Sequence, residues 1–217
     1  MPTPAQPKAP GSRTARKQRA ILEAAREVFL QHGYRAAAVD EIAALADVSK
    51  VTVYSHFSDK HSLFVAVFTD AIREAEESTQ SLLHGFSESG DIERDMRTFA
   101  RRHVVLVTQP HLVRMRRTII AEADRFPDLA RAWHRAGPER GHAALAAQLE
   151  RLAQRGVLRI DDPLLAAQHL NYLILSVPLN EAMFAVHKPY GRKRLHHFAD
   201  EAVRVFLAAY GTGKAPT

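Results

Sequence analysis

A short segment from Lys50 to His56 gathers side chains that can donate hydrogen bonds. Besides two valines, Val51 and Val53, the segment offers an ammonium, hydroxyls and an imidazole, at Lys50, Thr52, Tyr54, Ser55 and His56. Base edges in the major groove of DNA present acceptors, donors and the thymine methyl group, and an α-helix fits that groove. If the segment is helical, these short or rigid side chains suit a surface that reads base edges.

Two short helices, over residues 39–46 and 50–57, are predicted to position that surface. Their small or branched apolar residues recur at helical spacing and let the helices cross closely, at Val39, Ile42, Ala43, Ala46, Val53 and Phe57. Asp47 stands in the turn, where aspartate tolerates a left-handed backbone better than most residues. Val48 fills the turn, and Ser49 is expected to cap the second helix.

Basic residues on both sides of this pair of helices are candidates for phosphate contacts. Before Ile21 the chain carries lysines and arginines without an acid, at Lys8, Arg13, Arg16, Lys17 and Arg19. Lys60 is expected at the start of the next helix, whose N-terminus also favours anions. A solubilising tail is the alternative for the basic arm. The expected DNA-binding set is Arg16, Lys17, Ser49, Lys50, Val51, Thr52, Tyr54, Ser55, His56 and Lys60.

The rest of the chain has helical periodicity and no convincing strand. Residues 1–12 contain four prolines and are expected to be disordered. Helices are predicted over about 14–32, ending at Gly33, then 60–78, 91–107, from Pro110 to before Pro127, a short one with Leu129 and Trp133, 141–155, 163–187 and 192–210. Gly137 and Pro138 are expected to interrupt the chain, and Pro178 to kink or split its helix.

Composition excludes several classes of protein. The 217 residues include no cysteine, which rules out disulfides, thiolate metal sites and cysteine catalysis and fits a reducing cytoplasm. The first residues are polar and proline-rich, unlike a secretory signal. Polar residues interrupt the longest apolar run, 164–186, so a buried helix is expected there rather than a membrane span. A net charge of +6 favours a polyanionic partner.

The two short helices and their flanks resemble the TetR family of bacterial transcriptional regulators. The resemblance rests on Ile21 to Phe29, Gly33-Tyr34, Ile42-Ala43, Ala46, Val48-Ser49-Lys50, Thr52, Tyr54, His56-Phe57, Asp59-Lys60 and Leu63-Phe64. The stretch from Arg114 to Arg131 is similar to the C-terminal domain of a subgroup tied to efflux-pump control. Two positions depart from the family pattern. Ala38 replaces a capping Ser or Thr, and Asp47 replaces the turn glycine.

The resemblance implies an all-α fold with two folded domains. A three-helix helix-turn-helix domain over 13–59 is expected after a basic arm, 1–12, and before a larger helical ligand-binding and dimerisation domain, 60–211, with a tail at 212–217. It also implies a cytoplasmic homodimer on a palindromic operator of double-stranded DNA, most simply a repressor that a small molecule releases by moving the helix at 60–78. No cofactor or metal is implied.

The family pattern also implies a pocket among the middle helices and a dimer interface near the C-terminus. Candidate pocket residues are Phe99, His103, Met115, Ile119, Trp133 and Tyr172, with plain core as the simpler alternative for each. Arg102 and Arg116 could pair with an anionic ligand or lie on a solvated face. Candidate interface residues are Leu145, Leu149, Leu152, Leu170, Leu173, Val177 and Met183, with burial inside the monomer as the alternative.

Two other functions remain open from the residues alone. A histidine-dependent metal enzyme is one, because the chain has 12 histidines, but they are scattered and no HExxH pair occurs. A helical interaction module that has lost operator binding is the other, supported by Ala38 and Asp47. The sequence names neither effector, operator nor regulated genes.

Overall fold

The computed structural model describes residues 13–83, 91–184 and 190–213, with the backbone alone for 74–83. The elements are α1 (Arg13–Ala36), α2 (Val39–Leu45), α3 (Lys50–His56), α4 (Lys60–Leu83), α5 (Ile92–Val107), α6 (Pro110–Ala121), α7 (Pro127–His134), the π-helical turn η1 (Arg135–Glu139), α8 (Arg140–Gln154), α9 (Pro163–Phe184) and α10 (Arg192–Tyr210). The all-α prediction is confirmed. In the described ranges the β structure is one isolated bridge, Leu158 to Gly211. The predicted disorder of 1–12 lies outside them.

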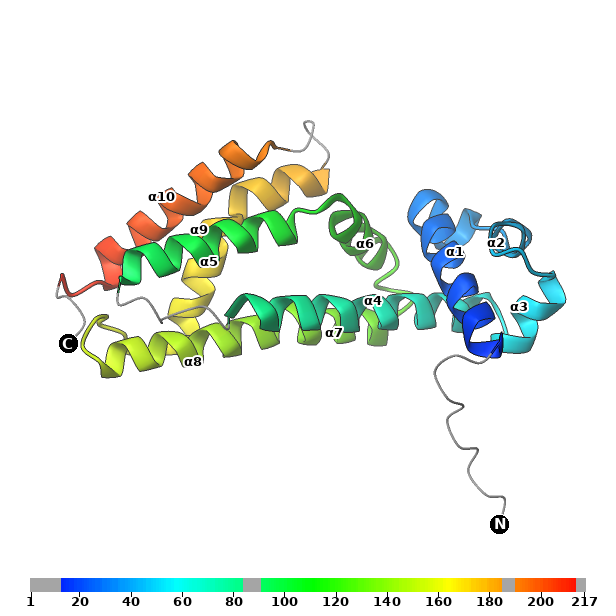
Figure 1. The fold of residues 1–217 in the computed structure, drawn as a ribbon, viewed down its shortest axis with the longest axis horizontal. Helices are drawn as coiled ribbons and strands as arrows, with labels where there is room; N and C mark the ends of the chain where they lie inside the picture. The colour runs from blue at the N-terminus through cyan, green and yellow to red at the C-terminus, as the bar shows by residue number, and fades with distance from the viewer. Residues whose placement is uncertain (1–12, 84–90, 185–189, 214–217) are drawn as a thin grey trace, which may run out of the picture.

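The helices form an elongated molecule with α1 to α3 at one end (Figure 1). The long helix α4 runs from this end along α7 and α8, while α5, α9 and α10 pack together on the other side. Two hydrophobic clusters hold the arrangement. The first joins α1 to α4 with residues of α6, α7 and η1, and the second joins α5, α8, α9 and α10. Helix α4 therefore belongs to the core of the helix-turn-helix end as well as to the body.

Four helices, α3, α4, α5 and α9, begin just after a residue whose side chain accepts a hydrogen bond from a first-turn backbone N–H. At α4, Ser62 N–H donates to Asp59 Oδ1 at 2.7 Å, and Asp59 N–H donates to Ser62 Oγ at 3.2 Å. Asp91 accepts from Arg94 N–H, and Asp162 from Leu165 N–H, each at 3.0 Å. Such caps depend on residues within three positions, which is why the sequence placed these starts well.

The two internal prolines act differently: Pro138 does not interrupt the chain as predicted, whereas Pro178 bends its helix without splitting it. Pro138 lies in η1, a wider turn that keeps α7 and α8 continuous instead of interrupting them. Pro178 lies inside α9, which remains one helix while its ribbon changes direction along its length (Figure 1). Asn180 Nδ2 donates to the Ser176 carbonyl at 2.6 Å near this proline. Among the described residues, α9 included, no helix is long and apolar enough to cross a membrane.

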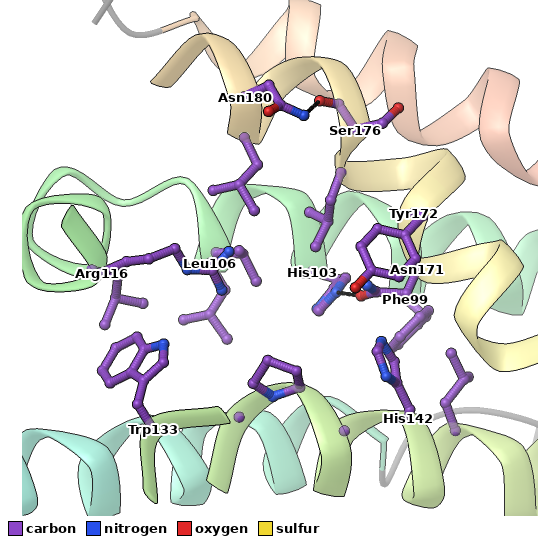
Figure 2. A pocket seen from close by; sticks show the side chains of 18 residues that line it. Phe99, His103, Leu106, Arg116, Trp133, His142, Asn171, Tyr172, Ser176 and Asn180 are labelled. Carbon is purple, nitrogen blue, oxygen red and sulfur yellow. Dashed lines mark hydrogen bonds between the residues drawn. The ribbon is translucent and has the colours of Figure 1, made fainter. Parts of the chain in front are cut away.

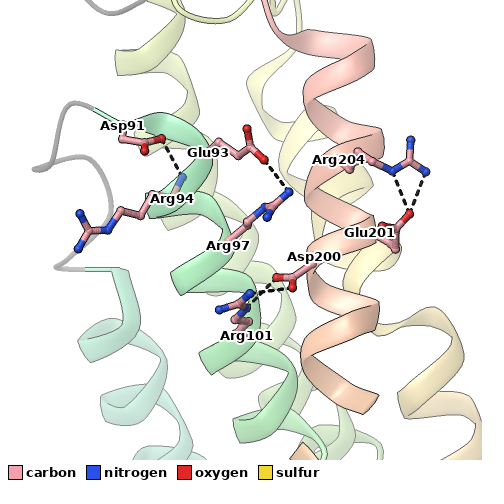
Figure 3. A network of polar contacts seen from close by, with 8 residues as sticks. All are labelled: Asp91, Glu93, Arg94, Arg97, Arg101, Asp200, Glu201 and Arg204. Atoms are coloured by element: carbon pink, nitrogen blue, oxygen red, sulfur yellow. Dashed lines mark hydrogen bonds and ion pairs between the residues drawn. The ribbon is translucent and has the colours of Figure 1, made fainter. Parts of the chain in front are cut away.

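A polar contact fastens α5 to α10 (Figure 3). Arg101 donates from Nε and from a terminal nitrogen to the two oxygens of Asp200, both at 2.7 Å. The hydrogen bonds from Arg101 hold the pKa of Asp200 below its usual range. Glu93 and Arg97, one turn apart on α5, pair at 2.6 Å beside it. A two-point contact of this kind sets the rotation of one helix against the other.

Gly33 is expected to matter for its backbone angles and not for the space around it. Its φ of 71° and ψ of 175° end the regular part of α1, and a Cβ there would meet nothing within 4 Å. We expect Gly33→Ala to lower the free energy of unfolding by about 1–3 kcal/mol, because other residues avoid these angles. Urea denaturation measures this. Gly137→Ala is the control, since its Cβ also meets nothing, and an equal loss in both variants would contradict the explanation.

Candidate DNA interface and ligand pocket

The α2–α3 unit has the geometry of a helix-turn-helix. Ile42 and Ala43 of α2 are buried with Val53 of α3 and with Phe57, which follows it. Asp47 has a φ of 52°, and within the described ranges no other non-glycine residue has a positive φ. Val48 N–H then donates to the Ala43 carbonyl at 3.0 Å and closes the turn. The left-handed turn predicted at Asp47 is confirmed.

The caps of the two helices differ as their residues predict. Ser49 Oγ accepts from the Thr52 backbone N–H at 3.1 Å, so the first turn of α3 is capped. Ala38 precedes α2 and supplies no side-chain hydrogen bond. The backbone still forms the first helical bond there, from Ile42 N–H to the Ala38 carbonyl at 3.2 Å. Helix α2 therefore depends on packing more than α3 does.

The outer face of α3 is open to solvent. Val51 is 78% exposed and Tyr54 is 43% exposed, which is high for large apolar or aromatic side chains. Lys50 and Ser55 are also exposed, and Thr52 and His56 are half-buried. The Ser55 hydroxyl donates to the Thr52 carbonyl at 2.8 Å. The face combines an apolar contact, an aromatic hydroxyl and a cation, which are groups that read base edges and phosphates.

The two lysines expected at this surface both have protein partners. Lys50 Nζ lies 3.0 Å from Asp40 of α2, and hydrogen bonding to this carboxylate raises the lysine pKa. Lys60 Nζ donates to the Arg35 carbonyl at 3.0 Å and lies 5.0 Å from the centre of the Tyr34 ring. Burial, and then the charge of Arg125, lower the pKa of Lys60. Lys60 thus braces α4 against α1.

A hollow with basic walls lies between the start of α1 and α3. Its lining, which we call the basic hollow, consists of Arg13, Thr14, Lys17, Thr52, Ser55 and His56. Arg16 is exposed but does not line it. The expected set omitted Arg13 and Thr14, although Arg13 and Lys17 are four residues apart and share a helix face. The hollow brings two cations beside the α3 donors.

A cavity of about 180 Å³ lies in the body of the protein (Figure 2). Helices α5, α6, α8 and α9 enclose it, together with the end of α7 and η1. Its wall is mostly apolar and aromatic. The lining residues are Phe99, His103, Leu106, Val107, Leu112, Arg116, Trp133, Gly137, Pro138, Gly141, His142, Leu145, Asn171, Tyr172, Leu175, Ser176, Leu179 and Asn180. The π-helical turn contributes Gly137 and Pro138, so a widened stretch of helix forms part of the wall.

About a third of the lining residues are polar, and only some of them have a hydrogen-bond partner within the protein. His103 Nε2 lies 2.9 Å from Asn171 Oδ1, and the Phe99 ring stacks on the imidazole with centroids 5.4 Å apart. The Nε2 atom of His142 is buried without a hydrogen-bond partner. Burial lowers the pKa of both histidines and of Arg116. The cavity combines a large apolar surface with a few directed polar groups, as ligand pockets do.

The structure divides the six expected pocket residues. Phe99, His103, Trp133 and Tyr172 line the cavity. Met115 and Ile119 do not, and their assignment is corrected. Both are buried in the first hydrophobic cluster, where α6 packs toward α1. Their spacing of four residues marks one face of α6, and that face meets a different neighbour. Of the two arginines considered, Arg116 lines the cavity and Arg102 is exposed.

Both parts of the chain match known protein families. Residues 21–67 match the family described as bacterial regulatory proteins, tetR family. Residues 94–212 match the family described as AefR-like transcriptional repressor, C-terminal domain. The chain belongs to the TetR family. This membership makes it a ligand-responsive, DNA-binding transcriptional regulator, and it agrees with the helix-turn-helix geometry.

Similar proteins support the TetR assignment over most of the chain. A putative TetR-family regulator from Mesorhizobium loti is 39% identical, with a TM-score of 0.84 over 93% of this chain and 100% of that one. The flavonoid-responsive regulator FrrA is 30% identical, with a TM-score of 0.71 over 92% and 99%. The repressor AcnR of Corynebacterium diphtheriae is 31% identical over 150 residues, 68% of this chain and 71% of its own.

The expected dimer residues also divide. Leu145, Leu149, Leu152 and Leu170 are buried in the second hydrophobic cluster, so their assignment to an exposed interface is corrected. They hold α8 and α9 against their own chain. Leu173 and Val177 are exposed on α9, and Met183 is half-buried. On α9, the exposed apolar residues that the expected interface set missed are Leu164, Leu165 and Phe184, together with Tyr172, which also lines the cavity. Because α9 is apolar on all sides, its sequence does not show which of its faces is buried within the monomer.

No metal cluster is found within the described ranges. There, no group of three or more His, Cys, Asp or Glu side chains lies in a position to hold a metal ion.

Ala38 offers a direct test of the missing cap. We expect Ala38→Ser to raise the free energy of unfolding by about 1 kcal/mol, because its hydroxyl can accept from an uncapped N–H of α2. Urea denaturation by circular dichroism measures it. Ala44→Ser is the control, since exposed Ala44 lies inside α2, where serine is a poorer helix former than alanine. A gain in both variants, or in neither, would contradict the capping account.

The pocket histidines should make stability depend on pH. Because burial lowers the folded-state pKa of His103 and His142, the unfolded chain binds more protons once the pH falls below about 6.5. The free energy of unfolding should therefore decrease as the pH is lowered through that value. Denaturation at several pH values should show a smaller decrease for His103→Gln combined with His142→Gln. The exposed His197→Gln is the control, and identical slopes in all three proteins would refute the assignment.

Proposed function

We propose that the protein is a cytoplasmic repressor that binds a palindromic operator as a homodimer and leaves it when a small molecule fills the cavity. The observation that carries the DNA part is the basic hollow beside the exposed face of α3. There, two cations of α1 lie beside the hydroxyls and the imidazole of α3, at one end of the molecule. The named repressors among its relatives, such as AcnR, support repression over activation.

In this proposal α3 enters the major groove and α1 holds the backbone. Tyr54 and Val51 lie on the exposed face and can contact base edges. Arg13 and Lys17 line the hollow beside them and can hold a phosphate. Lys50 would exchange Asp40 for DNA, at little cost because both partners of the pair are largely exposed, at 50% and 72%. Two copies of α3, one per subunit, would meet successive major grooves of a palindrome.

The exposed apolar residues of α9 support a dimer. Leu164, Leu165, Leu173, Val177 and Phe184 are all between 39% and 77% exposed. Side chains of this kind on one helix favour an interface, because a soluble protein gains free energy by covering them. The matching helix of a second subunit would supply the cover in a two-fold arrangement, where the same residues serve both sides.

The η1 turn supports a route from the cavity to the DNA-reading end. Gly137 lines the cavity, whereas its neighbour Ala136 belongs to the first hydrophobic cluster with Phe64 and Phe68 of α4. A ligand that displaces η1 would therefore shift α4, whose first turn meets α1 through Lys60. The ligand releases DNA only if it binds the displaced arrangement more tightly than the DNA-bound one.

The DNA interface can be tested with the full-length protein and its own upstream DNA. We expect Tyr54→Ala to abolish the footprint, because it removes the largest side chain of the exposed α3 face. Lys17→Ala should weaken binding and lower the slope of log K against log salt by about 0.9 for each phosphate that the protein then leaves unneutralised. Lys193→Ala removes an equal charge from an exposed position on α10 and is the control.

Sedimentation of each variant should show the same dimer as the unaltered protein. Wild-type footprints from Tyr54→Ala would overturn the assignment of α3. A salt slope that changes equally in Lys17→Ala and Lys193→Ala would overturn the role of the hollow, because it would show only a dependence on net charge. Efflux genes beside the operator would support the subgroup expected from Arg114 to Arg131.

A further inference from the structure

The polar lining of the cavity is biased toward positive charge. Arg116 is the one charged residue among the 18 that line it, and the lining contains no carboxylate. In the part of the chain that the structure describes, no acidic side chain pairs with Arg116. By contrast, Arg101 pairs with Asp200 and Arg97 pairs with Glu93. A partly buried cation without an acidic partner costs free energy. The position of Arg116 in the cavity wall is explained if a bound anionic ligand pairs with it.

His142 provides an independent observation at the same cavity. Its side chain belongs to a residue only 8% exposed, and its Nε2 atom has no hydrogen-bond partner. Buried polar atoms are nearly always paired, so an orphan atom in a cavity wall is a candidate ligand contact. Figure 2 shows His142 near Phe99 at one end of the cavity, and Arg116 with Trp133 at the other. The two unsatisfied groups thus lie at opposite ends.

The walls between these groups indicate the shape of the molecule that fits. Phe99, Trp133 and Tyr172 present aromatic rings, and Pro138 presents another flat apolar surface. Aromatic walls favour a planar ring, which packs against them by stacking or edge contacts. A cavity of about 150 Å³ can hold benzene, so the 180 Å³ here accommodates one ring with a short substituent.

We propose that the cavity recognises a small aromatic carboxylate, with its anionic group on Arg116 and a ring hydroxyl at His142. A hydroxyl suits either tautomer of the imidazole, because it both donates and accepts. The carboxylate gains a charge-assisted hydrogen bond that an uncharged analogue of the same shape lacks. The inference rests on the proposed function in one respect: this cavity is taken to be the effector site.

Trp133 makes the binding directly measurable. It is the only tryptophan in the chain, and it lines the cavity. Its fluorescence in the full-length protein can be titrated with cinnamate and with cinnamamide, two molecules of nearly equal shape and different charge. We expect cinnamate to bind at least about tenfold more tightly, the ratio that a single hydrogen bond to a charged group can give. Equal binding of the two, or binding of neither, would overturn the proposal.

Variants of Arg116 and His142 test the two proposed ligand contacts separately. Arg116→Met should abolish the preference for the acid, Arg116→Lys should keep part of it, and the exposed Arg102→Met should keep all of it. The gain of 4-hydroxycinnamate over cinnamate should disappear in His142→Leu and persist in Arg102→Met. Circular dichroism and sedimentation verify that each variant folds. A preference that survives Arg116→Met, or a hydroxyl gain that survives His142→Leu, would overturn the corresponding contact.

A separate DNA-release measurement keeps the two proposals distinguishable. The same acids are added to the protein–operator complex, and release is followed by fluorescence anisotropy. Acid-selective quenching of Trp133 without release would support the pocket assignment and overturn the effector role under the proposed function. Release without acid selectivity would support the effector role and overturn the ligand class.

Discussion

The contact on which the rest of the structure depends is the packing of Phe126 between the two ends of the molecule. Its ring centre lies 4.9 Å from that of Tyr34, at the end of α1, and 4.7 Å from that of Phe64, in α4. The Arg125 guanidinium lies over the ring of Tyr34, 4.5 Å from its centre. Buried rings of this size contribute more than any other side chains to a core. They fix where the helix-turn-helix stands relative to the body, and hence where α3 can point.

The same core explains why cavity and DNA surface can be coupled. Residues of α6, α7 and η1 enter the cluster that holds α1 to α4, so the wall of the cavity and the support of α3 share neighbours. Close-packed interiors transmit a displacement because they contain little empty volume to absorb it. The π-helical turn is the point where the two meet, with Ala136 in the core and Gly137 at the cavity. A regular helix there would direct its side chains differently.

The charged side chains differ in whether a group of the protein already binds them or whether they are available to a ligand. Arg101 and Lys60 have partners inside the protein and fasten helices to one another. Arg116 lines the cavity and has no acid there. Lys50 stands between these cases, since its acid is on the exposed surface and DNA can compete for it. The Arg101–Asp200 pair lies outside both the cavity lining and the basic hollow.

The sequence by itself determined the class of fold, most helix limits and the residues on the exposed face of α3. Those features are local, because caps such as Ser49, the glycine at Gly33 and the 3.6-residue period act within about four positions. The tertiary structure decided which neighbour each apolar face meets. Only packing placed Met115 and Ile119 in the core rather than the cavity, turned Lys60 toward Arg35, buried Leu149 and left Leu173 exposed. Hydrophobicity is not directional, so an apolar pattern shows that a side chain is covered without showing by what.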